Sequence, residues 1–194
     1  MAAAKPEQLQ MLWPEERLGA PPRVSVAGGY ALRTFRDGDM GAYLGLAHAA
    51  GFEHFDEKSV SEYMRHSLPG GVFVVERDAS GELVASAMAQ HVPEELHPAG
   101  GVLGWVMGRP GHSGRGLGLT VCAAATALLL RAGYRRIHLK TDDWRLAALK
   151  TYFNLGWVPF LFAAGMKERW REVCGKLAWP FAPESWPRAR EGRP

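Results

Sequence analysis

Four glycines fall within eight residues of this chain, at positions 111, 114, 116 and 118 of the stretch GHSGRGLGLTV. An apolar stretch, GGVLGWVMG (100–108), precedes them and predicts a strand, and an apolar run ending in VCAAATALLL follows and predicts a helix. Glycine loses more conformational freedom on folding than any other residue, so glycines at the entrance of a helix lower local stability. A strand–loop–helix unit is therefore expected, and its loop must let something approach the backbone closely.

The helix entrance behind this loop predicts an anion site. The first N–H groups of a helix lack intrahelical partners, and the helix dipole is positive at that end. Gly114, Gly116 and Gly118 allow a phosphate or pyrophosphate to approach the backbone, and Arg115 can add a charged contact. A Walker A loop needs a Gly-Lys-Ser/Thr ending and a dinucleotide loop needs Gly-x-Gly-x-x-Gly, and the stretch matches neither. A glycine-rich turn without a ligand remains the alternative.

Hydrophobic periodicity and turn residues along the rest of the chain predict the order β-α-α-β-β-β-α-β-α-β. Ser59 with Glu62 has the pattern of a capping box, Pro69-Gly70-Gly71 ends that helix, and Gly133 stands where a left-handed cap ends the next. The expected strands are 30–35, 72–77, 83–92, 100–108, 135–141 and 157–162, and the expected helices are near 40–52, 59–67, 116–131 and 144–155. We therefore expect an α/β fold of the α+β kind, with helices packed on the faces of a mixed sheet.

The length of 194 residues fits one domain with extensions. Residues 1–28 are rich in Pro, Glu and Arg and predict a loosely attached arm. The domain itself is expected at 29–165. The remainder, 166–194, is expected to form an amphipathic helix at 166–177 and an extended, Pro-rich tail.

Composition argues for a globular protein of a reducing compartment. Hydrophobic residues make up 47% of the chain, enough for a core, and Cys122 and Cys174 form no disulfide framework. The N-terminus lacks the apolar segment of a signal peptide, and VCAAATALLL is about half as long as a membrane span. The net charge of +3 comes without a basic face interleaved with aromatic residues, which argues against a nucleic-acid reader. We expect a cytoplasmic protein with no membrane partner.

Two segments resemble the acetyl-CoA core of the GNAT N-acetyltransferase superfamily. The first, VMGRPGHSGRGLGLTV, carries Pro110 upstream of a Gln/Arg-x-x-Gly-x-Gly/Ala signature, which 113–118 covers. The second, RRIHLKTDDWRLAALKTYFNLGWVPF, has the apolar helix of that family, with Tyr152 before a Leu-Gly-aromatic sequence at 155–157. The two segments stand in the order and spacing of the family, and the predicted element order upstream also agrees.

The resemblance implies a central, mostly antiparallel sheet that splays at the cofactor strand and is flanked by helices. It also implies acetyl-CoA as the co-substrate and no metal. The backbone amides of the glycine loop would hold the pyrophosphate of CoA, and the strand before the loop would bind the pantetheine arm as a further strand does. The cofactor-binding residues implied in this way are Val106, Met107, Gly108, Gly114, Arg115, Gly116, Leu117, Gly118 and Arg145.

Two positions depart from the family pattern. Ser113 stands at the Gln/Arg position of the signature, so backbone amides must supply most of the phosphate contacts. Arg145 stands where many relatives have an asparagine. Its guanidinium is expected either to contact the cofactor or to pair with Asp142 or Asp143.

The resemblance assigns Tyr152 as the acid that protonates the departing CoA thiolate, with a plain core aromatic as the alternative. N–H groups near Met107 would stabilise the oxyanion. The strand 100–108 carries no carboxylate or imidazole, so the general base stays open among His91, Glu94, Glu95 and His138. Four tryptophans are expected either to line the acceptor side or to belong to the core: Trp105, Trp144, Trp157 and Trp170.

These residues predict an acyl-CoA-dependent N-acetyltransferase that moves an acetyl or small acyl group to an amine of a small molecule or a peptide. The alternative is a CoA-binding regulatory or scaffold module without catalysis, because two family positions differ and the central strand lacks an acid. Segments 40–67 and 91–101 are expected to shape the acceptor side. A homodimer is one possible assembly.

Overall fold

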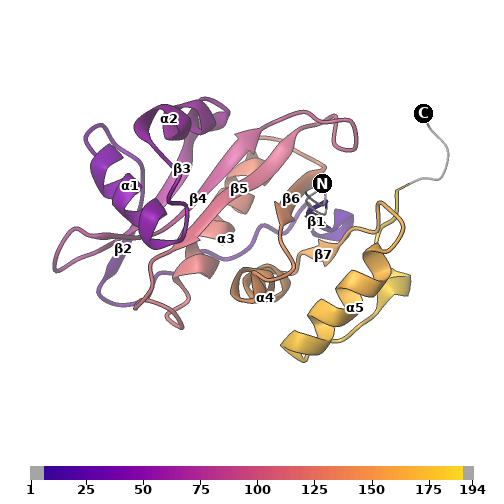
Figure 1. Ribbon diagram of the computed structural model, residues 1–194. Coiled ribbons are helices and arrows are strands. Elements are labelled where there is room, and N and C mark those ends of the chain that lie inside the picture. Colours follow the sequence, from indigo (N-terminus) through magenta and orange to yellow (C-terminus); the bar gives the residue numbers. More distant parts are fainter. Residues whose placement is uncertain (1–6, 190–194) are drawn as a thin grey trace, which may run out of the picture.

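A mixed sheet forms the centre of the computed structural model, which describes residues 7–189 (Figure 1). Within those residues the sheet has seven strands in the order β2-β3-β4-β5-β6-β1-β7, and only the β5–β6 pair is parallel. The strands are β1 Leu9–Leu12, β2 Tyr30–Thr34, β3 Ser67–Arg77, β4 Leu83–His91, β5 Gly101–Gly108, β6 Ile137–Thr141 and β7 Val158–Pro159. The helices are α1 Met40–Ala49, α2 Glu57–Arg65, α3 Leu117–Arg131, α4 Leu146–Leu155 and α5 Met166–Leu177, with short 3-10 turns at Glu15–Arg17 and Pro183–Ser185. The predicted α/β fold with a mixed sheet is confirmed.

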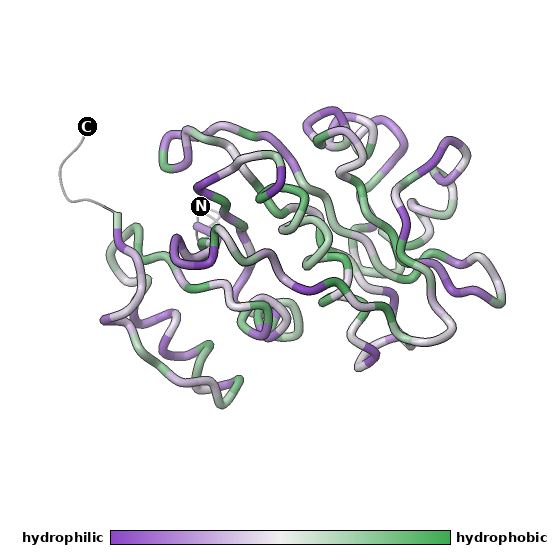
Figure 2. The backbone as a smooth tube through the Cα atoms, turned by 180° about the vertical axis from the view of Figure 1, so that it is seen from behind, coloured by the Kyte–Doolittle hydropathy of each residue, from purple (hydrophilic) through white to green (hydrophobic). Residues whose placement is uncertain are grey.

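Two hydrophobic cores lie on opposite faces of the sheet. The alternation along β4 separates them, since Met88 packs with α1 and α2 whereas Ala87 and Ala89 pack with α3. The small side chains of β4 let α3, itself rich in buried alanine, lie close to the strands. Figure 2 shows the hydrophobic stretches running through the middle of the molecule and the hydrophilic residues gathered in loops at its rim.

The long helix α3 ends as the sequence predicts. Gly133 has a φ of +87°, and its N–H donates to the carbonyl of Leu130 at 3.0 Å. The next N–H, from Tyr134, donates to Leu129 at 3.1 Å, which completes a Schellman cap. Among the helices of residues 7–189, none is long and apolar enough to cross a bilayer.

Strand β1 lies where the sequence predicted only a loosely attached arm. Leu9 and Met11 are fully buried, and β1 pairs antiparallel with β6 on one side and β7 on the other. The prediction is wrong for these residues because the strand owes its existence to partners more than a hundred residues further along the chain. Residues 1–6 of the predicted arm lie outside the described residues.

The C-terminal part packs against α4 at the far end of the sheet from α1 and α2 (Figure 1). Helix α5 has the predicted bounds, and its Trp170 is fully buried. The Pro-rich segment after α5 folds back, because Trp186 packs edge-on against Trp170 and Arg188 bridges to Leu161. The extended tail is therefore not observed up to residue 189, and 190–194 lie outside the described residues.

Three local predictions around α2 and the last strand are wrong. The helix is capped by Asp56, whose carboxylate accepts the Ser59 N–H at 2.7 Å, so Ser59 is the third helical residue and not the cap. The segment Pro69-Gly70-Gly71 lies within β3, at an irregularity in its pairing with β4. The last strand is only Val158–Pro159, since a proline offers no N–H to continue the ladder.

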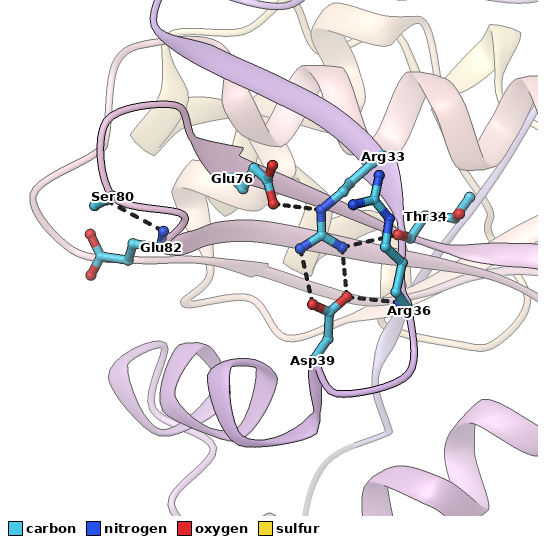
Figure 3. A network of polar contacts seen from close by, with 7 residues as sticks. All are labelled: Arg33, Thr34, Arg36, Asp39, Glu76, Ser80 and Glu82. Atoms are coloured by element: carbon cyan, nitrogen blue, oxygen red, sulfur yellow. Dashed lines mark hydrogen bonds and ion pairs between the residues drawn. The ribbon is translucent and has the colours of Figure 1, made fainter.

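Arg33 on β2 ties the edge of the sheet to the start of α1 (Figure 3). Its guanidinium donates to Asp39 at 2.6 Å and to Glu76 of β3 at 2.5 Å. The carboxylate of Asp39 also accepts the N–H of Arg36 at 2.8 Å, and it makes no cap bond to α1 although it stands at the N-cap position. The hydrogen bond from Arg33 holds the pKa of Asp39 below its usual range.

Candidate active site

Strands β5 and β6 pair only at their beginnings. The ladder joins Gly101 to Ile137 and Val102 to His138, and no pairing follows. On its other side β5 carries an irregularity against β4, because Met107 faces Ser86 while Gly104 faces Met88, which leaves one extra residue on β5. Within this irregularity Trp105 has a φ of +50°, a left-handed conformation that a bulky residue rarely adopts. The sheet therefore opens between β5 and β6 and is bent at the same level.

A cavity of about 420 Å³ lies at this opening. Its lining combines strand residues on one side with α2 and the segment between α1 and α2 on the other, as expected for segments 40–67 and 91–101. The residues are Gln8, Phe52, His54, Tyr63, His66, Gln90, Val92, Glu94, Val102, Leu103, Gly104, Trp105, Val106, His138, Lys140, Asp142, Arg145 and Tyr152. A second cavity, of about 290 Å³, lies by β1 and the tail and contains none of the predicted site residues.

The glycine loop between β5 and α3 needs glycine for its backbone conformation. Gly114 and Gly116 have φ values of +79° and +74°, and an added Cβ at either would meet no atom within 4 Å. Gly118 differs, since it lies inside α3 and a Cβ there would make ordinary contact with Thr151 at 3.8 Å. The space in front of Gly114 and Gly116 is therefore open, which an approaching ligand requires.

The N-terminus of α3 presents unpartnered N–H groups at this loop. Thr120 donates the first intrahelical bond, to the carbonyl of Gly116 at 3.0 Å, so the N–H groups of Leu117 and Gly118 have no helical acceptor. Gly116 is the N-cap and supplies no side chain to satisfy them. The Arg115 guanidinium donates to the carbonyl of Gly111 at 2.6 Å and so braces the loop. Backbone N–H groups and the helix dipole together form a site for an anion.

A profile of the acetyltransferase (GNAT) family matches residues 34–157, more than half of the chain, including the glycine loop and Tyr152. The chain belongs to the GNAT acetyltransferase family. No curated protein sequence matches the chain. Solved structures show the same fold, and three of them are described next.

A GCN5-related N-acetyltransferase from Sphaerobacter thermophilus is 22% identical, with a TM-score of 0.60 over 80% of this chain and 49% of that one. The ribosomal-protein-S18-alanine N-acetyltransferase from Escherichia coli is 20% identical, with a TM-score of 0.53 over 66% of this chain and 76% of that one. An aminoglycoside N-acetyltransferase in complex with CoA is 17% identical, with a TM-score of 0.53 over 66% of this chain and 86% of that one. The chain thus spans about half the length of the Sphaerobacter structure, and the likeness at these identities concerns the fold.

Arg145 lies inside the β5–β6 opening of this GNAT fold. Its guanidinium donates to the carbonyl of Val106 at 3.2 Å and lies over the ring of Phe52, 5.1 Å from its centroid. The alternative of an ion pair with Asp142 or Asp143 is not observed: Asp143 pairs with Arg169, and Asp142 accepts a hydrogen bond from Gln8 at 3.3 Å. The positive charge of Arg145 therefore stays at the cavity.

Tyr152 belongs to both the core and the cavity. It is 3% exposed, packs in the larger core, and also contributes to the cavity lining. Burial raises the pKa of its phenol above the usual range, while the nearby charge of Arg145 acts in the opposite direction. The hydroxyl consequently holds its proton at neutral pH and can donate it.

The candidates for a general base separate clearly in the structure. Glu94 and His138 line the cavity, and Glu94 forms an ion pair with Lys140. His91 lies outside the lining and pairs with the hydroxyl of Tyr134 at 2.8 Å. Glu95 is exposed and also lies outside the lining. Among the tryptophans, Trp105 lines the cavity, Trp157 and Trp170 are core residues, and Trp144 is 76% exposed.

A buried pair of histidines was missed by reasoning from the sequence. The rings of His97 and His138 stack with centroids 3.7 Å apart and an angle of 16° between their planes. His97 donates from Nε2 to the Gln10 side chain at 2.6 Å and accepts at Nδ1 from Arg136 at 3.3 Å, which defines a neutral ring. The alternation of His138, Lys140 and Asp142 places them on one face of β6 and was the available signal, but His97 comes from a loop whose path no pattern predicts.

Burial is the main cause of low pKa values in this pair. It lowers the pKa of His97 to about 3 and that of His138 to about 4, with neighbouring positive charges adding to the effect. The Gly101 backbone lies near the His138 ring and opposes the shift, but not in hydrogen-bonding geometry, since neither ring nitrogen has a partner among the described residues. Both imidazoles are neutral at pH 7.

Proposed function

We propose that this chain is an acyl-CoA-dependent N-acetyltransferase that transfers an acetyl or small acyl group to an amine of a small molecule or peptide in the cytoplasm. One observation carries the proposal. The cavity that holds Val106 and Tyr152 sits in the gap between two unpaired parallel strands, and β5 leads from it directly into the open glycine loop of α3. A long ligand with a phosphate at one end and a reactive group at the other fits that arrangement.

The residues present fit coenzyme A. The open backbone at Gly114 and Gly116 and the free N–H groups of Leu117 and Gly118 suit its pyrophosphate, as the resemblance predicts. Bound acetyl-CoA supplies an acyl group activated on sulfur. Backbone groups from Val106 to Gly108 have no β6 partner and can bond the extended arm as a neighbouring strand would.

The chemistry asks two things of the chain near the sulfur. Tyr152 holds a proton on its hydroxyl and would donate it to the leaving thiolate. The N–H groups of the bent β5 segment around Met107 would stabilise the oxyanion, because their direction is set by the fold before the substrate arrives. Arg145 binds the Val106 carbonyl and would lie beside the pantetheine arm, where its charge favours the thiolate form of the product.

The experiment combines cofactor binding with turnover. Thermal shift and calorimetry with CoA test whether the cofactor binds, and release of free thiol from acetyl-CoA in the presence of a primary-amine panel tests transfer. We expect CoA to raise Tm and at least one amine to accelerate thiol release above hydrolysis. CoA binding without any amine-dependent release would support a CoA-binding module in place of an enzyme, and the absence of CoA binding would overturn the proposal.

A further inference from the structure

The half of the cavity away from the glycine loop has a polar floor and an aromatic wall. His138, Lys140 and Asp142 alternate along and just beyond β6, so all three face the cavity. Lys140 is neutralised by its ion pair with Glu94. Asp142 has no ion pair within residues 7–189 and accepts one neutral hydrogen bond, from Gln8. The floor therefore offers one carboxylate whose charge no cation balances.

His138 is the second unusual group in the floor. It is 0% exposed, it lines the cavity, and both of its ring nitrogens lack hydrogen-bond partners among the described residues. Its ring is held in place by stacking on His97, which Gln10 and Arg136 fix in turn. A buried polar group without a partner destabilises the folded protein by about 1–3 kcal/mol, so such groups in native proteins commonly serve a ligand. His138 is thus a rigid, neutral hydrogen-bonding group facing the cavity.

The wall opposite consists of aromatic rings. Tyr63 of α2 stacks on Trp105 of β5 with centroids 3.9 Å apart and 25° between the planes. Trp105 is kept there by its left-handed backbone, a strained conformation of the kind that clusters at ligand sites. Arg145 covers the ring of Phe52, so Tyr63 and Trp105 form the part of the wall that remains available. A flat apolar group is the natural complement of such a surface.

We propose that this half of the cavity binds the acyl acceptor as a primary amine carried on a flat, apolar group, with the ring against Tyr63 and Trp105 and the amine end between Asp142 and His138. The inference rests on the proposed function. Asp142 attracts the ammonium ion on arrival, and His138 supplies a hydrogen bond to that end of the molecule. A sugar amine or a polyamine has no group that matches the wall, and a molecule without an amine has none that matches Asp142.

The test measures binding to the CoA-saturated protein by calorimetry. The probe is 2-phenylethylamine, with ethylamine as the control without a ring and 2-phenylethanol as the control without an amine. We expect 2-phenylethylamine to bind at least tenfold more tightly than either control. Tyr63→Ala should abolish the preference over ethylamine and Tyr63→Phe should keep it, because Tyr63 contributes its ring face; Tyr63→Leu replaces the alanine variant if that does not fold.

Two further variants address the amine end. Asp142→Asn should weaken 2-phenylethylamine at least tenfold and leave 2-phenylethanol unchanged. His138→Phe keeps the stacked ring and removes both nitrogens, and it should weaken 2-phenylethylamine severalfold with the CoA affinity intact.

The outcomes separate this inference from the proposed function. Normal CoA binding with ethylamine equal to 2-phenylethylamine in affinity and in thiol release would overturn the inference and leave the transferase standing. The same holds if Tyr63→Leu and Asp142→Asn leave the affinity of 2-phenylethylamine unchanged. Failure to bind CoA, with no amine releasing thiol, would instead remove the proposed function on which the inference rests.

Discussion

The stacked histidines make the stability of this protein sensitive to mild acid. In the unfolded chain a histidine has a pKa of about 6.5, whereas burial lowers the pKa of His138 to about 4 and that of His97 to about 3 in the folded protein. Between these values the unfolded chain binds protons that the folded chain does not, so the free energy of unfolding falls as the pH falls. The full contribution is present above the unfolded pKa and is lost progressively below it.

The size of the effect follows from linkage. Lowering the pH from 7 to 5 protonates each of these histidines in the unfolded chain alone, and at about 1.4 kcal/mol per pKa unit this amounts to about 2 kcal/mol for each ring. The pair should therefore remove about 4 kcal/mol of stability. The carboxylates whose pKa values lie below the usual range, Asp39 and Asp143 among them, titrate in the unfolded chain mostly below pH 5 and contribute little in this interval.

Urea unfolding at pH 7, 6 and 5 measures this loss directly. His138→Phe keeps the stacked aromatic ring and removes one of the two titrations, so the loss between pH 7 and 5 should fall to about half that of the parent. Parallel pH profiles for the parent and the variant would refute the reasoning, because they would show that His138 is protonated equally well in the folded protein.

Three substitutions test the site and its support. Tyr152→Phe should lower kcat by about 10²–10⁴ with Tm and CoA affinity nearly unchanged, and unchanged turnover would remove the acid role. Ser113→Ala should change the CoA affinity, measured by calorimetry, by less than about tenfold, since one neutral hydrogen bond contributes about 0.5–1.5 kcal/mol. Gly156→Ala should cost roughly 2–3 kcal/mol in urea unfolding, because φ is +97° there and the new Cβ would displace Arg17 from its hydrogen bond to the Leu155 carbonyl; a parent-like midpoint would contradict this.

Local patterns predicted what local interactions determine. Helix α3 with its Gly133 cap, helix α5 and the hairpin β3–β4 depend on neighbours in the chain, and each lies close to its predicted position. The family resemblance placed the glycine loop and Tyr152 beside one opening of the sheet. Their roles in binding and catalysis stay predictions.

Features that depend on distant partners could not be predicted in the same way. Strand β1 has four residues, too few for a convincing alternation, and gains its stability between β6 and β7. The stacking of His97 on His138 needs a loop to fold over β6, and its partner Gln10 lies on that unrecognised strand. The ion pair of Asp143 with Arg169 likewise joins β6 to α5, so Arg145 was left free for the cavity.

The CoA affinity of variants in the glycine loop tests the central claim most directly. Gly116→Val places a branched side chain at a φ of +74° and in the open space in front of the loop, whereas Gly118→Ala keeps every N–H group and makes only ordinary contact with Thr151. With circular dichroism showing both variants folded, we predict at least a tenfold loss of CoA affinity for Gly116→Val, about 1.4 kcal/mol, and a parent-like value for Gly118→Ala. A folded Gly116→Val protein that binds CoA as tightly as the parent would contradict the account.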